Sequence, residues 1–270
     1  MQLDPSDQVL GHPKGLFILF FTEMWERFSY YGMRALLTLY LTKHMLFGDE
    51  TAALIYGSYT SLVYAVPVLG GLIADRYLGF RKAVTLGAIL LVAGHFGMAF
   101  EGSPATQVIS DQGDLSVQRD PFYEQIFYFS LALIIVGVGF LKPNISTIVG
   151  RLYETEDPRR DSGFTIFYMG INVGAFVATL LCGYLGETYG WKYGFGLAGI
   201  GMLFGLATFQ WGQPYLHGHA EPPDEERLAE KIIAGISRER LIYAGAILGV
   251  VVAWQAVQRT GELGLALSIF

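Results

Sequence analysis

Six stretches of predominantly apolar residues follow one another along this chain, each about 20 residues long. A helix of that length crosses the hydrocarbon core of a bilayer, which is about 30 Å thick. Only 16% of the residues are charged, whereas soluble domains carry about 25%. The pattern therefore predicts an all-α membrane protein. The six stretches cover residues 16–41, 53–74, 83–100, 122–149, 163–186 and 193–211.

The order of these stretches divides the chain into three parts. Residues 1–211 are expected to form a six-helix transmembrane bundle. Residues 212–240 are rich in Pro and in charge, which indicates a cytoplasmic linker. The third part, residues 241–270, holds a shorter apolar stretch at 241–257 and the beginning of a second one. Because the sequence stops inside that second stretch, we expect it to be the N-terminal portion of a longer protein.

Basic residues are distributed unevenly between the connections. With the N-terminus placed in the cytoplasm, eleven Lys and Arg residues fall in inner segments and three in outer ones, which predicts this orientation. The polar segment 101–120 is then a long outer loop. No cleavable signal peptide is visible. The inner residues are Lys14, Arg76, Arg81, Lys82, Arg151, Arg159, Arg160, Arg227, Lys231, Arg238 and Arg240; the outer ones are Lys43, Arg119 and Lys192.

The first span carries charge at its centre. On a helix that turns about 100° per residue, six of its polar and aromatic side chains fall within an arc of about 140°. Charge at membrane depth is costly and persists only where it is paired or faces a water-filled cavity. A structural ion pair would explain Glu23 and Arg27 but not the rest, so this stripe is a candidate functional site. Its members are Glu23, Glu26, Arg27, Tyr30, Tyr31 and Arg34.

A second charge lies deep in the fourth span. Lys142 is more than a turn from either end, where a lysine reaches the interface only with difficulty. We expect it to meet a carboxylate, with Glu26 the natural partner, or an anionic ligand; a purely structural Lys–Glu pair is the alternative. Tyr64 in the second span, and Tyr168 with Asn172 in the fifth, are weaker candidates for the same cavity.

Other kinds of chemistry find no support in the sequence. His95 lies alone in the third span, and Cys182 is the single cysteine, so no disulfide forms within the chain. No His, Cys, Asp or Glu cluster has the spacing of metal ligands, and no nucleophile stands beside a base. We therefore predict no enzyme, no catalytic residue, no metal and no cofactor.

Four segments resemble the signatures of one known family. The sequence EMWER at Glu23–Arg27 is similar to the ExxER motif of the proton-dependent oligopeptide transporters, which belong to the major facilitator superfamily. Three further matches follow in the same order. They are GGLIADRYLGFRK at 70–82, which contains the superfamily's inner-loop motif, FLKPNISTIVG at 140–150 and FTIFYMGINVGA at 164–175.

The resemblance implies roles for individual residues. Glu23, Glu26, Arg27 and Lys142 would form the proton-coupling group, with Lys142 pairing to ionised Glu26. Arg34 and Lys142 would hold the peptide's carboxylate. Some members carry a histidine in the second helix where this chain has Gly57, so the coupling role falls on the glutamates. The substrate pocket would comprise Tyr30, Tyr31, Arg34, Tyr64, Lys142 and Asn172, and the inner-loop motif Asp75, Arg76, Gly79 and Arg81.

The resemblance also implies a fold and an activity. The fold is that of the major facilitators, with a six-helix bundle on each side of the substrate site, of which this chain supplies the first. Bacterial members insert two extra helices between the bundles, and residues 241–270 would be the start of that inserted pair. The expected activity is proton-coupled import of di- and tripeptides across a bacterial inner membrane, with protons as the coupling ion and the second bundle and the lipid bilayer as partners. A transporter of nitrate or another small anion and a non-transporting receptor or scaffold remain as alternatives.

Overall fold

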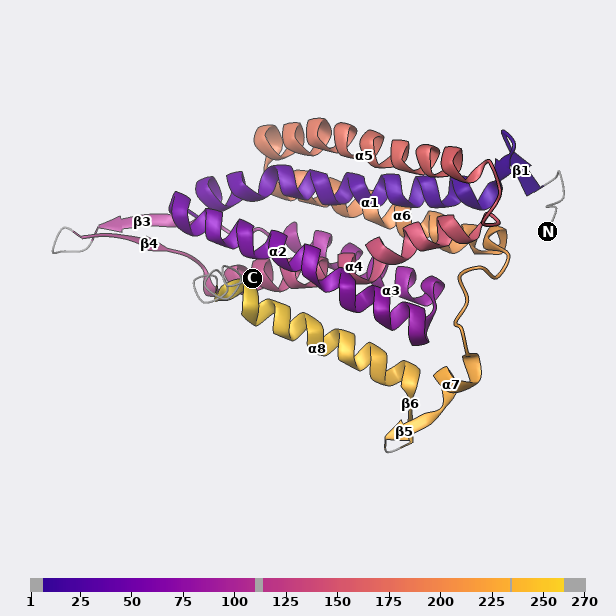
Figure 1. The fold of residues 1–270 in the computed structure, drawn as a ribbon. Coiled ribbons are helices and arrows are strands. Elements are labelled where there is room, and N and C mark those ends of the chain that lie inside the picture. The colour runs from indigo at the N-terminus through magenta and orange to yellow at the C-terminus, as the bar shows by residue number, and fades with distance from the viewer. Residues whose placement is uncertain (1–6, 110–113, 234, 260–270) are drawn as a thin grey trace.

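The computed structural model describes residues 7–109, 114–233 and 235–259. Long helices lie side by side along one direction (Figure 1). The main ones are α1 (Lys14–Leu39), α2 (Asp49–Ile73), α3 (Phe80–Met98), α4 (Pro121–Arg151), α5 (Arg160–Tyr189), α6 (Trp191–Gly212) and α8 (Arg238–Gln258). Wider π-helical turns extend α1 as η2 (Tyr40–His44) and α2 as η3 (Ala74–Leu78), and a short 3₁₀ helix η4 (Gln213–Leu216) follows α6.

Six of the helices that the structure describes are long and apolar enough to cross a membrane. The first helix, α1, is not one of them although it has 26 residues, because ionisable side chains interrupt its apolar character. The predicted all-α membrane fold is confirmed. The six candidate spans are Asp49–Leu78, Phe80–Met98, Pro121–Arg151, Arg160–Tyr189, Trp191–Leu216 and Arg238–Gln258.

Glycines allow the helices of the bundle to approach closely. A Cβ added at Gly174 of α5 would lie 2.2 Å from the carbonyl oxygen of Met24 in α1, and one at Gly170 would lie 3.0 Å from that of Phe20. In the same way, Gly70 of α2 meets Gly139 of α4. Burial away from water does not drive helix association inside a bilayer, so close backbone packing of this kind supplies the attraction.

Helix α8 lies against the outside of the bundle. It runs beside α4 in Figure 1, and the rings of Phe129 and Trp254 meet edge to face with centroids 5.7 Å apart. Its 21 residues give it the length of a span. The second apolar stretch near the C-terminus falls outside the described residues.

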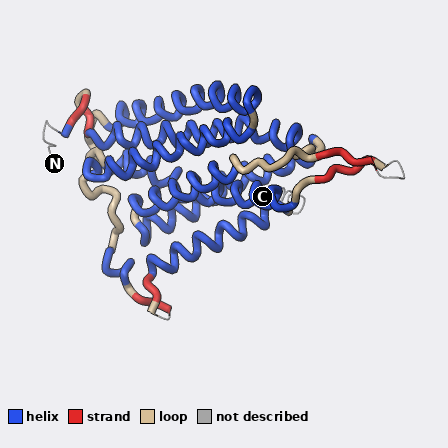
Figure 2. The backbone as a smooth tube through the Cα atoms, turned by 180° about the vertical axis from the view of Figure 1, so that it is seen from behind, coloured by secondary structure: helices blue, strands red, loops and turns tan. Residues whose placement is uncertain are grey.

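In the part of the chain that the structure describes, three short antiparallel hairpins stand outside the bundle (Figure 2). The predicted outer loop 101–120 differs from expectation because part of it pairs as strands, Thr106 opposite Gln118 and Ile109 opposite Leu115. Alternating polar and β-branched residues favour strands there. Arg119 fixes the base of this hairpin by donating to the carbonyl of Leu46 at 3.0 Å. The strands are β1 (Gln8–Val9) with β2 (His12–Pro13), β3 (Thr106–Ile109) with β4 (Leu115–Gln118), and β5 (Lys231–Ile233) with β6 (Ile236–Ser237).

The opposite end of the bundle from β3–β4 is here called the basic end. It comprises the start of α1, the α2–α3 and α4–α5 connections and residues 213–238, which include the short helix α7 (Glu225–Ala229). The segment after η4 packs directly onto the α2–α3 connection. Gly79 has a φ of +76°, and a Cβ there would lie 2.5 Å from the nitrogen of Pro222, so glycine is required on both counts.

Candidate functional site

Three ionisable side chains of α1 form a buried ion-paired group. Arg27 Nε lies 3.0 Å from Glu23 Oε1 and also contacts Glu26 Oε2. The exposed fractions of Glu23, Glu26 and Arg27 are 3%, 0% and 4%. Helical spacing of four residues places Glu23 and Arg27 on the same face, so the sequence alone brings these two together.

The charges in this group do not balance. Two carboxylates share one guanidinium, and within the described residues Glu26 Oε1 is buried without a hydrogen-bond partner. An unpaired carboxylate oxygen in a water-excluded site is costly. The arrangement is therefore poor as a purely structural ion pair, and it suits a group that gains and loses a proton.

The stripe continues along α1 through two tyrosines to Arg34. The Arg27 guanidinium lies 5.3 Å from the centroid of the Tyr30 ring, and the Tyr30 and Tyr31 rings meet edge to face with centroids 5.2 Å apart. Arg34 Nε donates to the hydroxyl of Tyr56 in α2. The polar face of α1 is thus turned toward α2.

The opposite face of α1 packs on two other helices. Phe28 lies beside Gly201 of α6, and Gly32 lies against Cys182 of α5. These contacts fix the rotation of α1, because a turn of the helix about its axis would separate both. The polar stripe is thereby held away from α5 and α6.

Two tyrosines of α2 belong to this region although the sequence analysis did not single them out. Tyr56 accepts from Arg34, and Tyr59 is fully buried with a hydroxyl that has no hydrogen-bond partner in the described part of the chain. Glu26 and Arg34 lie close enough to Tyr59 to interact electrostatically with its hydroxyl. The sequence could have revealed both tyrosines, since Tyr56, Tyr59 and Tyr64 are spaced so that they fall on one side of a helix.

Lys142 reaches this region from α4 but not in the expected pairing. Its ammonium lies 4.6 Å from the centroid of the Tyr64 ring, and across the described ranges no ion pair joins it to Glu26, which contacts Arg27 instead. Lys142 is nevertheless close enough to Arg27, Glu26 and Glu23 for electrostatic interaction with all three. The lysine thus lies near the ion-paired group as a separate, half-buried cation.

The α5 candidates are less closely connected. Tyr168 is 52% exposed, and Asn172 is exposed and donates its amide to the backbone carbonyl of Tyr168 at 3.2 Å. This is a bond within the same helix, so Asn172 is not tied to the charged residues of α1 or α4. Tyr64 is also outward-facing, with 59% of its surface exposed.

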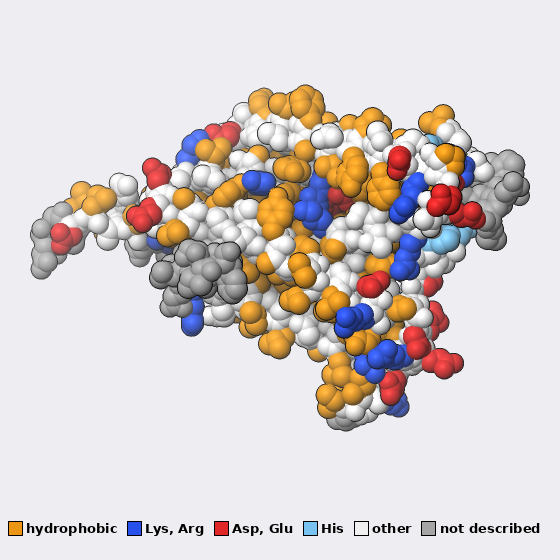
Figure 3. All heavy atoms as spheres, viewed as in Figure 1, with side chains coloured by type: hydrophobic (Ala, Val, Ile, Leu, Met, Phe, Trp, Pro, Cys, Tyr) orange, Lys and Arg blue, Asp and Glu red, His pale blue; other side chains and the backbone are white. Residues whose placement is uncertain are grey.

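Figure 3 shows how the site opens on one face of the molecule. Near the middle of this face, over α1 and α2, a few charged side chains are visible among apolar and uncharged ones. Arg34 and Lys142 are both partly exposed. A small anion approaching this face would meet two cations, with the buried carboxylates behind them.

The inner-loop motif lies at the basic end, far along the helices from the charged group. Arg81 forms an ion pair with Glu221 at 2.7 Å, and its backbone N–H donates to the carbonyl of Ala220 at 2.7 Å. Asp75 lies 3.8 Å from Arg151, and Arg76 is exposed. Arg81 thus joins the start of α3 to the segment after η4, and Asp75 joins η3 to the end of α4.

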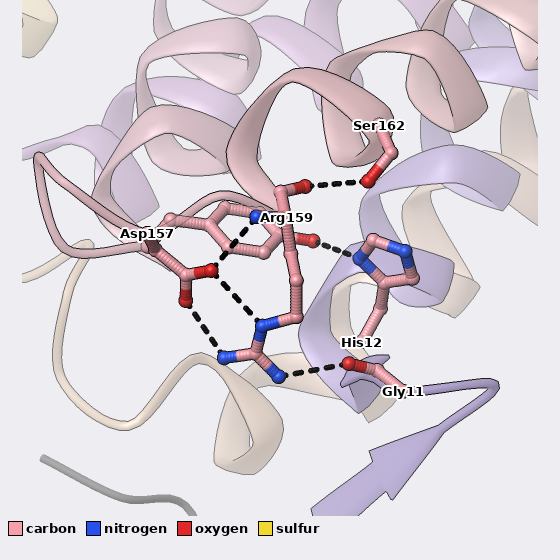
Figure 4. A network of polar contacts seen from close by, with 6 residues as sticks. Gly11, His12, Asp157, Arg159 and Ser162 are labelled. Atoms are coloured by element: carbon pink, nitrogen blue, oxygen red, sulfur yellow. Dashed lines mark hydrogen bonds and ion pairs between the residues drawn. The ribbon is translucent and has the colours of Figure 1, made fainter.

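A polar network at the same end joins the N-terminal hairpin to the α4–α5 connection (Figure 4). Arg159 pairs with Asp157 at 2.7 Å and donates to the carbonyl of Gly11 at 2.8 Å, while His12 Nδ1 lies 2.8 Å from the Tyr153 hydroxyl. The hydrogen bonds from Arg159 lower the pKa of Asp157 to about 2. Burial, assisted by the charge of Arg159, lowers the pKa of His12, and burial raises that of Tyr153 to about 12.

The remaining ionisable candidates stand apart from both regions. His95 is fully buried, and neither ring nitrogen has a hydrogen-bond partner in the ranges described. Cys182 is buried against α1 with its thiol free. Among the described residues, no group of His, Cys, Asp and Glu is arranged to hold a metal ion.

Comparison with known proteins identifies the family. Residues 81–258 match the POT family. The chain belongs to this family. It is 42% identical over 205 residues to peptide transporter YePEPT of Yersinia enterocolitica, covering 74% of this chain and 37% of that protein. It is also 37% identical over 259 residues to a di-/tripeptide transporter of Lactococcus lactis. This match covers 91% of this chain and 47% of that protein.

Solved structures agree with this assignment. A mutant of peptide transporter POT in complex with alafosfalin matches with a TM-score of 0.74 and 38% identity, over 97% of this chain and 50% of that chain. A POT family transporter in complex with 5-aminolevulinic acid matches with a TM-score of 0.72 and 34% identity, over 96% and 49%. The predicted family and major facilitator fold are confirmed, and the family is one of transporters and not of enzymes.

The chain spans less than half the length of the curated relatives it matches. The covered shares are 37% and 47% for the two transporters above and 39% for the transporter YclF of Bacillus subtilis, to which it is 48% identical over 210 residues. The matched part of each relative therefore corresponds to one portion of a longer transporter.

Proposed function

We propose that this chain forms the N-terminal six-helix bundle of a proton-coupled symporter that imports di- and tripeptides. The observation that carries the proposal is the buried group of Glu23, Glu26 and Arg27 beside the partly exposed cations Arg34 and Lys142. Ionisable residues at membrane depth mark ion and substrate pathways. The names of the two peptide-transporting relatives support a peptide as the substrate.

Coupling would arise from competition for cations. In the structure Glu26 contacts Arg27, with Lys142 nearby. An incoming peptide carboxylate would compete with Glu26 for the positive charge of Lys142 and Arg27. Because like charges that share a cation repel, binding of the peptide would favour protonation of Glu26. By linkage, protonation would favour peptide binding to the same extent, which symport requires.

The substrate would lie against the open face of the stripe. Arg34 and Lys142 would hold its carboxylate, and Tyr30, Tyr31, Tyr64 and Asn172 would line the pocket together with Tyr56. A second bundle would close the pocket from the other side, and the two would rock about the site to give alternating access. Protons are the only coupling species in this scheme, and no cofactor takes part.

The basic end would face the cytoplasm of a bacterial cell, with the helices in the inner membrane. The excess of Lys and Arg at that end supports this orientation. The membrane potential would then assist import by about 2.3 kcal/mol per positive charge for each 100 mV. The motif residues Asp75, Arg76, Gly79 and Arg81 would lie on the cytoplasmic side, where the bundle moves against its partner.

The coupling role is tested by Glu26→Gln in the full-length protein. The amide removes the proton-binding site and keeps the shape, so accumulation of labelled di-alanine driven by an inward proton gradient in proteoliposomes falls to the level without a gradient. Exchange of peptide at equal pH on both sides persists. Driven uptake that survives the substitution would remove Glu26 from coupling.

Carboxylate recognition is tested by Arg34→Ala. A charge-assisted hydrogen bond contributes about 1.5–3 kcal/mol, so affinity for a dipeptide with a free C-terminus falls about tenfold or more. A C-terminally amidated dipeptide loses far less. Equal losses for the two ligands, measured by competition against labelled di-alanine, would exclude Arg34 from carboxylate binding.

Uptake measurements in the same proteoliposomes distinguish the peptide symporter from the alternative functions. Competition of uptake by nitrate, and not by dipeptides or tripeptides, would identify a transporter of another anion, because Arg34 and Lys142 suit any small anion. Failure to accumulate any solute from such a panel under a proton gradient would favour a receptor or scaffold.

A further inference from the structure

A groove of about 310 Å³ lies at the basic end, apart from the charged site. Its walls come from the first turns of α3, the end of α6 with the start of η4, and the start of α8. In α3 the lining residues recur at intervals of three to four, so they share one face. The lining consists of Arg81, Lys82, Thr85, Leu86, Ile89, Gln210, Gln213 and Tyr243.

The chemistry of this groove changes along α3. Arg81 and Lys82 stand in its first turn, and Leu86 and Ile89 follow one and two turns deeper. Ile89 is 51% exposed, so an apolar surface follows the basic residues along α3. A polar head next to an apolar channel matches a phospholipid, with its headgroup at the helix ends and an acyl chain along α3.

The polar rim is rich in hydrogen-bond donors. Gln210 donates to Thr85 Oγ1 at 2.9 Å and Gln213 donates to Gln210 at 2.6 Å, so the two amides bridge α3 and α6. Lys82 donates one of its three N–H groups to Glu239 at 2.7 Å. No carboxylate is among the described residues that line the groove, but Glu221 pairs with Arg81 and Glu239 with Lys82, each at 2.7 Å, from just outside it. An anion in the groove would therefore bind through the remaining N–H donors of Arg81 and Lys82 and those of the two amides.

We propose that this groove binds an anionic phospholipid of the leaflet that the basic end meets. The phosphate lies against Lys82, Arg81 and the amides of Gln210 and Gln213, and one acyl chain lies along Leu86 and Ile89. Basic pockets between membrane helices are suited to such headgroups. The proposal requires only that the chain spans a bilayer and does not depend on peptide transport.

The experiment is a lipid titration of the full-length protein in detergent, read by native mass spectrometry. The probes are phosphatidylglycerol, phosphatidylcholine and sn-glycerol 3-phosphate. Phosphatidylglycerol is expected to bind most tightly, and glycerol phosphate, which lacks the acyl chains, weakly. Because binding is measured without a substrate or a proton gradient, failure of the transport proposal leaves the result unaffected.

Matched variants locate the site. Lys82→Gln weakens binding of phosphatidylglycerol about fivefold, the effect of one basic residue at an anionic headgroup. Lys43→Gln is the control, since Lys43 also pairs with a glutamate, Glu187, at 2.6 Å but lies at the other end of the bundle. Glu239→Gln frees Lys82 and strengthens binding.

A fourth variant separates a lipid from a free phosphate. Ile89→Trp fills the apolar part of the groove and leaves the basic rim intact, so it removes lipid binding and spares glycerol phosphate. The proposal is overturned if Lys82→Gln and Lys43→Gln have the same effect, if phosphatidylcholine binds as tightly as phosphatidylglycerol, or if glycerol phosphate competes equally with the lipid. Should Lys82→Gln fail to fold, Ile89→Trp and Glu239→Gln still decide the question.

Discussion

Arginine forms ion pairs with carboxylates in two regions of this molecule, one buried and one near the surface. Arg27 lies between Glu23 and Glu26 with side chains that are 5%, 4% and 0% exposed, whereas Arg159 and Asp157 at the basic end are 41% and 15% exposed. An exposed pair contributes little because water competes for both partners. A buried pair costs several kcal/mol in lost hydration. The surface pair is accounted for as a local contact of the hairpin that costs little, whereas the desolvation cost of the buried group is not explained by stability and is consistent with the coupling role proposed above.

The largest expected effect is that of Arg27→Ala. Loss of the cation leaves two carboxylates buried without a partner, so the free energy of unfolding falls by about 3–5 kcal/mol. Arg159→Ala is the matched change at the surface and costs about 1 kcal/mol or less. Apparent melting temperatures of both variants in the same detergent check the difference. Equal shifts would show that depth does not distinguish the two pairs.

A smaller effect is expected from the packing that keeps the buried group in place. Gly174→Ala puts a Cβ within 2.2 Å of the Met24 carbonyl, so α1 and α5 must separate, at about 1–3 kcal/mol. Gly183→Ala in the same helix meets nothing within 4 Å and raises helix stability by up to about 1 kcal/mol.

Thermal unfolding of the two glycine variants measures this contrast. A matching loss of proton-driven uptake in Gly174→Ala would connect the packing of α1 to the charged group. Opposite signs of the two melting shifts are the expected result, and a destabilised Gly183→Ala would contradict it.

The smallest effect concerns the hairpin at the basic end. Burial and the charge of Arg159 lower the pKa of His12 below its ordinary value of 6.5, so the unfolded chain takes up a proton at a higher pH than the folded one. The contribution of neutral His12 to the stability of the folded chain is therefore complete when the pH is above 6.5, and it is lost as the pH falls below 6.5 toward the lowered pKa of the folded state. Asp157, with a pKa of about 2, stays ionised throughout this range.

Hydrogen exchange of residues 7–13 at about pH 7.5 and about pH 5.5 tests this effect. Exchange becomes faster at the lower pH, after correction for the intrinsic rate, and His12→Gln removes the difference. A pH dependence that persists in His12→Gln would assign it to another group.

Much of the helical part of the fold could be predicted from sequence, because apolar runs of about 20 residues have few other solutions in a membrane. Strands in 101–120 were missed because short polar hairpins carry little signal beside long apolar runs. Within α1, spacing alone placed Glu23 and Arg27 on one face, since a helix fixes the angle between residues four apart. Tyr56 was missed because its partner Arg34 lies on another helix.

The sequence by itself determined that the chain forms long, mostly apolar helices of a membrane protein, which residues of α1 share a stripe, and to which family the chain belongs. The tertiary structure decided the partners: Glu26 contacts Arg27 while Lys142 lies over Tyr64, and Arg81 pairs with Glu221. Positions within one helix follow from a fixed rotation per residue. Contacts between helices depend on their depth, tilt and closeness, which glycine packing across the whole bundle sets together.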